Sequence, residues 1–307
     1  MSLRLAERGA RAVMLQQIFT VIAPVFLIAA LGYFWDKRRL PFDTAMVTYL
    51  ASNVGAPCLL LATILERRPQ ISEMLDMVAA ATLLVVITGL LGAGLLRLLR
   101  QPIPVYLPSI MFPNAGNMGI PLSMFAFGDA GLAAAVAYFA TMSVLQFSLG
   151  IAVSSGRLHW REVVGSPVIW AMVVAFAMIG LDLRLPDWIG NTVQVLSGVV
   201  IPLMMLSLGV SLARLKPSKG TLSRSFGFAV FRLGAGFVVA LGIVNVLDLT
   251  GPVRGAAIIQ SSMPTAVFNY LFALRYGNRP DEVAGMVVVS TLIAFALLPL
   301  LLAYVLS

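Results

Sequence analysis

The sequence predicts an all-α membrane protein of ten transmembrane helices, arranged as two five-helix halves. Of its 307 residues, 60% are hydrophobic and only 11% are charged, whereas an ordinary soluble domain is about 25% charged. The apolar residues fall in long blocks, each close to the roughly 20 residues that a membrane-spanning helix needs. Two of these blocks are interrupted by dense turn-forming residues at corresponding places in the two halves.

Polar or turn-forming segments separate ten apolar blocks. Residues 1–14, which carry three arginines, precede the first block and are expected to form an N-terminal extension. The ten expected spans are residues 15–35, 44–65, 74–96, 104–127, 130–153, 163–181, 188–213, 225–247, 252–274 and 282–305.

The Lys and Arg residues between the spans predict the orientation of the chain. If the N-terminus is outside, the inner loops hold 13 basic residues and the outer segments hold 7. Cytoplasmic loops carry an excess of Lys and Arg. We therefore expect a multi-pass protein of the bacterial inner membrane with both termini in the periplasm.

The chain divides into a first repeat at 15–153, a cytoplasmic linker at 154–162 and a second repeat at 163–307. Five helices per half make the second half inverted relative to the first, a common transporter architecture. Corresponding prolines support the division. Pro57 and Pro202 are 145 residues apart, and Pro113 and Pro264 are 151 residues apart.

The fourth and ninth spans are expected to be broken helices. The fourth packs two prolines, two glycines and two asparagines into the nine residues 113–121. A proline inside a helix removes a backbone donor and clashes with the preceding turn. Backbone groups freed inside a bilayer must be paired by neighbouring protein or lie in a wet cavity. Ordinary kinked packing helices are the alternative.

Three segments carry a resemblance to the auxin efflux carrier family. Pro113 and Asn114, followed by MGIPL at 118–122, are similar to that family's most recognisable segment. MPTAVFNYLFALRYGNRPDE at 263–282 resembles its C-terminal pattern, and LSLGVSL at 206–212 fits its seventh helix. The resemblance covers nearly the whole chain, with a very short central loop that is typical of a compact bacterial member.

This resemblance implies two inverted five-helix repeats in which broken helices 4 and 9 cross at mid-membrane. Helices 1, 2, 6 and 7 would form a scaffold, through which a homodimer would form if there is one. Helices 3–5 and 8–10 would form a transport domain. The residues expected to shape the crossover are Pro113, Gly119, Pro121 and Pro264.

A crossover of this kind suits a carboxylate, because half-helix N-termini carry partial positive charge and free N–H donors. Neutral side chains would add hydrogen bonds, although mid-membrane amides often only hold helices together. Gln146 and Gln260 are expected to serve packing or gating. The candidate substrate-binding residues are Asn53, Asn114, Asn117, Thr265 and Asn269.

Arg232 is the one charge well inside a span, about seven residues from the expected start of helix 8. Two interpretations stay open. The side chain snorkels to the cytoplasmic interface, or it is a counter-charge for an entering anion.

Composition argues against several classes of function. All thirteen acidic residues fall in loops or at span ends, which disfavours a proton antiporter with a buried carboxylate. One Cys and one His make a metal site with nitrogen and sulfur ligands implausible. The basic residues are spread over loops, which disfavours nucleic-acid binding. We expect no catalytic constellation and no cofactor.

The favoured function is therefore a secondary transporter of a small organic anion by alternating access, in contact with membrane lipid. The resemblance suggests malonate, malate or a related carboxylate, or an auxin-like acid. The alternatives are a sodium-coupled organic-anion symporter of the bile-acid symporter type, and a membrane channel or receptor.

The orientation is testable with single cysteines at Ser155 and Ser307 in a Cys58→Ala background. An impermeant thiol reagent added to whole cells should label position 307 and not position 155, because the basic loops are expected inside. Labelling of position 155 from outside would overturn the orientation.

Overall fold

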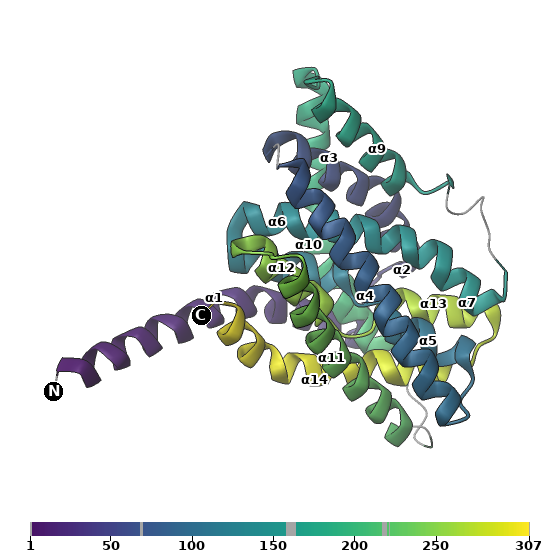
Figure 1. The fold of residues 1–307 in the computed structure, drawn as a ribbon. Helices are drawn as coiled ribbons and strands as arrows, with labels where there is room; N and C mark the ends of the chain where they lie inside the picture. Colours follow the sequence, from purple (N-terminus) through teal and green to yellow (C-terminus); the bar gives the residue numbers. More distant parts are fainter. Residues whose placement is uncertain (1, 68–69, 158–163, 217–219, 221, 307) are drawn as a thin grey trace.

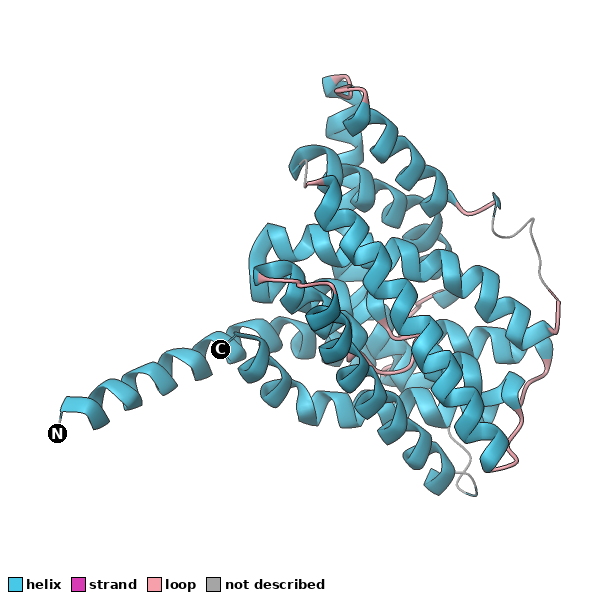
Figure 2. Ribbon diagram, in the orientation of Figure 1, coloured by secondary structure: helices cyan, strands magenta, loops and turns pink. Residues whose placement is uncertain are grey.

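The computed structural model describes residues 2–67, 70–157, 164–216, 220 and 222–306. Over these ranges the chain is helical, and the one bridge of extended backbone joins two helix breaks. Figure 2 shows this all-helical fold, and Figure 1 traces the chain through it. Residues 158–163 of the predicted linker lie outside the described residues.

The first half begins with a helix that is longer than expected. α1 starts at Ser2, so the expected N-terminal extension continues the first helix and projects from the body (Figure 1). The remaining elements of this half are α2 (Thr44–Leu50), η1 (Ala51–Gly55), α3 (Ala56–Arg67), α4 (Ile71–Leu98), α5 (Ile103–Met111), η2 (Ala115–Gly119), α6 (Ile120–Leu145), η3 (Gln146–Gly150) and α7 (Ile151–Ser155).

The second half has fewer interruptions. Its elements are α9 (Pro167–Gly180), α10 (Asp187–Arg214), α11 (Leu222–Val246), α12 (Gly251–Ser261), α13 (Val267–Tyr276) and α14 (Pro280–Leu306). The expected ninth span is therefore split into α12 and α13, as its proline predicts.

Within the described residues, seven stretches of helix are long and apolar enough to cross a membrane. Each difference from the ten expected spans has a local cause. The fourth and fifth spans join in one run from Ala115 to Ser155, which turns at Gly128 with φ at +61°. The sixth span is a helix of only 14 residues, and the ninth is divided by its break.

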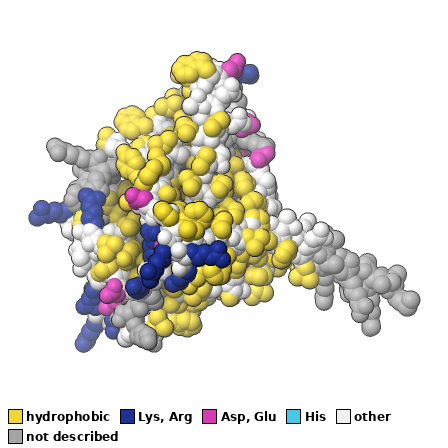
Figure 3. All heavy atoms as spheres, turned by 180° about the vertical axis from the view of Figure 1, so that it is seen from behind, with side chains coloured by type: hydrophobic (Ala, Val, Ile, Leu, Met, Phe, Trp, Pro, Cys, Tyr) yellow, Lys and Arg dark blue, Asp and Glu magenta, His cyan; other side chains and the backbone are white. Residues whose placement is uncertain are grey.

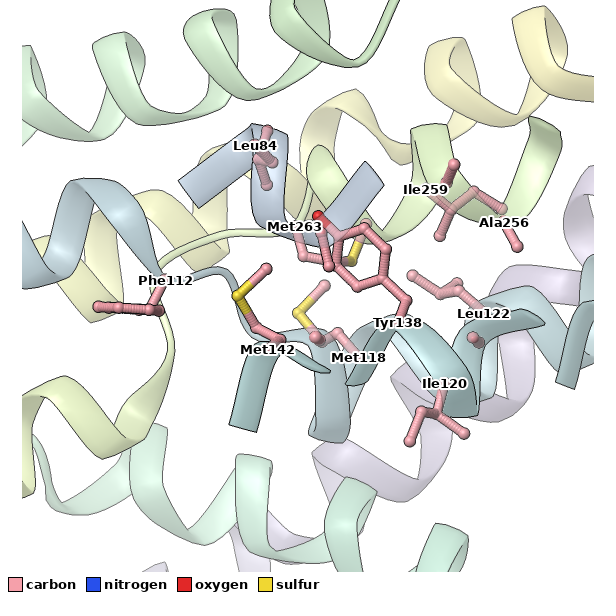
Figure 4. Packing of buried hydrophobic residues seen from close by; sticks show 14 of the residues in the cluster. Leu84, Phe112, Met118, Ile120, Leu122, Tyr138, Met142, Ala256, Ile259 and Met263 are labelled. Carbon is pink, nitrogen blue, oxygen red and sulfur yellow. The ribbon is translucent and has the colours of Figure 1, made fainter. Parts of the chain in front are cut away.

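The exposed surface is apolar over much of its area. Figure 3 shows a face covered largely by hydrophobic side chains, with the visible Lys and Arg mainly in its lower half. Large side chains such as Phe19, Leu90 and Val246 are more than 70% exposed, as suits a chain whose solvent is lipid. Inside the protein, the buried hydrophobic core includes Met118, Tyr138, Met142 and Met263, which lie close together (Figure 4).

Glycine allows α1 and α10 to approach closely. A Cβ built on Gly209 would lie 1.8 Å from the carbonyl oxygen of Ala29, and one on Gly32 would lie 2.1 Å from that of Leu206. Small residues at such contacts are how membrane helices pack without a hydrophobic driving force. This pair of glycines therefore fixes the α1–α10 contact.

Gly209→Ala should lower the free energy of unfolding by about 1–3 kcal/mol, because the added methyl group forces the two backbones apart. The matched control is Gly198→Ala on the same helix, where an added Cβ meets nothing within 4 Å. Thermal melting in detergent measures both. Equal melting temperatures for the two variants would show that the contact is not tight.

Candidate functional site

Two broken helices meet in the middle of the fold. The chain leaves helical geometry between Met111 and Ala115 and again between Ser261 and Val267. Pro113 and Thr265 form an antiparallel bridge. The Asn114 N–H donates to the Pro264 carbonyl at 2.7 Å, and the Ala266 N–H donates to the Phe112 carbonyl at 3.1 Å. Each break thus supplies the backbone partners that the other lacks.

The bridge places two helix N-termini beside each other. One begins at η2 and continues into α6, and the other is α13. Asn114 caps the first, since its Oδ1 accepts from the Asn117 N–H at 3.3 Å. Ala266 precedes the second and provides no side-chain cap. Unsatisfied N–H groups and the helix dipole make such ends favourable for an anion.

The Asn114 amide also presents a free donor. Its side chain is only 4% exposed, and Nδ2 has no hydrogen-bond partner among the described residues. A buried polar group without a partner costs roughly 1–3 kcal/mol. Because Asn114 lines a cavity, a bound acceptor would remove that cost.

This cavity, called the crossover pocket below, has a volume of about 280 Å³. It extends from the bridge to the end of α10 at Arg214 and the start of α2 at Thr44. Its lining as described contains no Asp or Glu. The apolar lining residues include Val47, Phe139, Met142, Leu203, Met204, Phe268 and Leu271, and the polar ones include Thr48, Ser52, Asn114, Asn117, Ser143, Gln146, Ser207 and Ser211.

Three wide, π-helical turns converge on the crossover pocket. They are η1, η2 and η3, and each contributes lining residues: Ser52 from the first, Asn117 from the second and Gln146 from the third. Single π-helical turns are uncommon and are found frequently at functional sites. Their convergence is independent support for this pocket as the site.

The candidate residues divide between the pocket and its supports. Asn114, Asn117 and Pro113 line the pocket, whereas Asn53, Thr265 and Asn269 are not in its described lining. Asn53 donates to the Tyr49 carbonyl of its own helical segment at 3.0 Å.

Thr265 and Asn269 hold the two breaks in place. The Thr265 hydroxyl donates to the Ser109 carbonyl at 2.9 Å, and its N–H donates to the Ser290 hydroxyl at 3.1 Å. Asn269 Nδ2 donates to the Phe112 carbonyl at 3.3 Å. These groups are already committed to protein partners.

The remaining crossover residues shape the backbone. Pro121 lies where η2 passes into α6, and it lacks the N–H that would continue the helical hydrogen bonds there. Gly119 lies against Gln260, whose Oε1 would be 2.1 Å from an added Cβ. Pro264 provides the carbonyl that pairs with Asn114.

Arg232 lies inside the protein rather than at an interface. Its side chain is 0% exposed, and Nη2 donates at 3.0 Å to the carbonyl of Ser261, the last residue of α12. Nε and Nη1 have no hydrogen-bond partner among the described residues. The guanidinium thus lies at the negative end of the α12 dipole, beside the break that leads to Thr265.

Comparison with known proteins shows the family of the chain. A family model described as "Membrane transport protein" matches residues 17–156 and 151–302. The chain belongs to the auxin efflux carrier family of membrane transport proteins. It is therefore a multi-pass membrane transporter and not an enzyme.

Three relatives show how far the likeness extends. An uncharacterized transporter of Methanocaldococcus jannaschii is 24% identical over 88% of this chain and 93% of its own. One of Methanothermobacter thermautotrophicus is 29% identical over 61% of this chain, which spans 63% of that relative. Auxin efflux carrier component 7 of Arabidopsis thaliana is 30% identical over 47% of this chain and only 24% of its own length.

The burial of Arg232 gives a test of its role in this transporter. Burying a charge costs several kcal/mol, whereas a cation at a helix C-terminus returns about 0.3–2 kcal/mol. Arg232→Met should therefore keep or raise the melting temperature. Because Arg232 is not in the described lining of the crossover pocket, a fall in anion affinity in this variant would identify the guanidinium as a counter-charge that acts on the anion from a distance. A lower melting temperature with unchanged affinity would identify a structural role instead.

Proposed function

We propose that the chain is a secondary transporter that moves a small organic anion by alternating access and binds the anion's carboxylate at the crossover. The observation that carries this proposal is the buried Asn114 Nδ2, an unpaired donor on a residue that lines the crossover pocket beside two helix N-termini. Two kinds of donor therefore lie along one cavity: the backbone N–H groups of two helix N-termini and the Asn114 amide.

The charge of the site supports an anion. The described lining has no carboxylate that would repel one, and its one charged residue is Arg214 at the outer end. Arg214 is already engaged by Asp36 at 2.7 Å and by the Phe42 carbonyl at 2.9 Å. The inner end is therefore held by neutral donors, which bind a carboxylate without the strong attraction of a full cation and so permit its release.

The cavity favours a small substrate. A volume of about 280 Å³ lies at the low end of ligand pockets. Its walls are largely apolar, so the body of the substrate would pack against side chains such as Phe139 and Met142. Malonate, malate and an auxin-like acid all have a carboxylate that the inner end would hold.

The contacts between helices support a division into a scaffold and a transport domain. α1 packs against α10, and α3 packs against α9 and α10, which form the proposed scaffold. α4 packs against α6, and α11 packs against α12 and α14, which form the proposed transport domain. The bridge pairs Pro113 with Thr265, the neighbour of its repeat equivalent Pro264. Movement of the second group against the first would carry the crossover between the two membrane faces.

The proposed orientation makes the pocket accessible from the cytoplasm. Both of its outer residues, Thr44 and Arg214, lie next to the loops that the basic residues assign to the inside of a bacterial inner membrane. Substrate-dependent counterflow in proteoliposomes distinguishes this carrier from a channel, because only a carrier exchanges substrate across alternating states.

Asn114→Ala tests the site. It should weaken binding of the best carboxylate ligand by about 10- to 100-fold, because one charge-assisted hydrogen bond of about 1.5–3 kcal/mol is lost. The free energy of unfolding should fall by no more than about 0.5–2 kcal/mol, because the variant loses the Oδ1 cap on the Asn117 N–H, whereas Nδ2 has no protein partner to lose among the described residues. Calorimetric titration and thermal melting measure the two quantities.

The matched control is Asn53→Ala, which removes the same type of side-chain amide from a residue outside the described pocket lining. Its affinity should stay normal. Normal affinity in Asn114→Ala would remove Asn114 from the site, and a lower melting temperature with normal affinity would make it a packing residue.

A further inference from the structure

A chain of hydrogen bonds behind the pocket fixes the orientation of one further amide. The Phe112 carbonyl can only accept, so the Asn269 group that contacts it at 3.3 Å must be the NH₂ group. Asn269 Oδ1 is then the acceptor for Gln146 Nε2 at 3.0 Å. The order of donors and acceptors is therefore set by the backbone, from Phe112 through Asn269 to Gln146.

Gln146 presents the opposite end of its amide to the pocket. Its side chain is 6% exposed and lines the crossover pocket from η3. Because Nε2 is directed to Asn269, the carbonyl oxygen Oε1 is the group left for a ligand. This oxygen carries two acceptor lone pairs and cannot donate.

Asn114 is oriented in the reverse sense. Its Oδ1 accepts from the Asn117 N–H at 3.3 Å, which leaves the NH₂ group unpaired on a residue that lines the pocket. One small cavity thus contains a fixed donor from Asn114 and a fixed acceptor from Gln146. A simple carboxylate satisfies the first and leaves the second without a partner.

We propose that Gln146 is a specificity-determining residue and that the substrate carries a hydrogen-bond donor, a hydroxyl or N–H group, in addition to its carboxylate. This inference rests on the proposed function for the position of the carboxylate. Asn269 acts through Gln146 as a positioning residue, because it prevents the amide from turning its NH₂ group into the pocket.

The chain of hydrogen bonds from Phe112 through Asn269 to Gln146, called the relay below, gives the selectivity a physical basis. A pocket built to bond a hydroxyl disfavours the analogue that lacks it, because a buried polar group is then left unpaired. If Gln146 were free to rotate, it would serve a donor or an acceptor equally well. The bond to Asn269 leaves Gln146 with only an acceptor for the ligand, so the site favours a ligand that carries a donor.

The experiment compares matched pairs of acids that differ by one hydroxyl. The probes are lactate with propionate, 3-hydroxybutyrate with butyrate, malate with succinate, and 3-phenyllactate with 3-phenylpropionate. Binding to the purified full-length wild-type protein is measured by calorimetric titration. At least one hydroxy acid should bind about 10-fold more tightly than its partner.

Two variants assign that preference to the relay. Gln146→Leu should reduce it to within about 2-fold, because the acceptor is lost. Asn269→Leu should also reduce it, because the Gln146 amide becomes free to rotate, although Asn269 is not in the described lining. Asn114→Ala should weaken both members of a pair equally and leave the preference intact.

Equal binding within every pair by the wild-type protein would overturn the inference, and this result needs no variant to fold. A preference that persists in Gln146→Leu would also overturn it. Two different results would contradict the proposed carboxylate site. In the first, Asn114→Ala binds both members of a pair as tightly as the wild-type protein does. In the second, the wild-type protein binds no acid of the panel.

Discussion

The short antiparallel bridge between the two helix breaks is the interaction on which the rest of the structure depends. A helix that opens inside a bilayer exposes backbone groups that lipid cannot satisfy. Here the opening at Pro113 and the opening at Pro264 satisfy each other through the Asn114 N–H and the Ala266 N–H. Neither break would be tolerated without the other, so the two halves of the chain must come together at this point.

The site follows from this pairing. Because the two broken segments cross and then resume as helices, two helix N-termini face one cavity. The surrounding polar groups then take different roles. Thr265 and Asn269 are bound to backbone carbonyls and hold the crossing rigid. Asn114 keeps a donor unpaired, which is a cost to the empty protein and an advantage once an anion is bound.

Much of the fold was predictable from the spacing of apolar blocks, and the positions of both breaks from the crowding of Pro, Gly and Asn. The sequence did not distinguish among the five candidate amides and hydroxyls, because periodicity gives a residue's helix and depth but not its hydrogen-bond partner. Asn53, Thr265 and Asn269 are all used within the protein. Gln146 was expected to serve packing or gating, and only its contact with Asn269 shows which end of its amide is free. The π-helical turns likewise had no sequence signal.

The structure of the protein with a bound carboxylate tests the central claim most directly. A bromine-substituted aromatic carboxylate would mark its own position by anomalous scattering, and its carboxylate should lie at hydrogen-bond distance from Asn114 Nδ2, about 2.7–3.2 Å. The bromine should then lie among the apolar side chains of the crossover pocket. A carboxylate found at Arg214 or outside the pocket, with Asn114 Nδ2 still unpaired, would contradict the account.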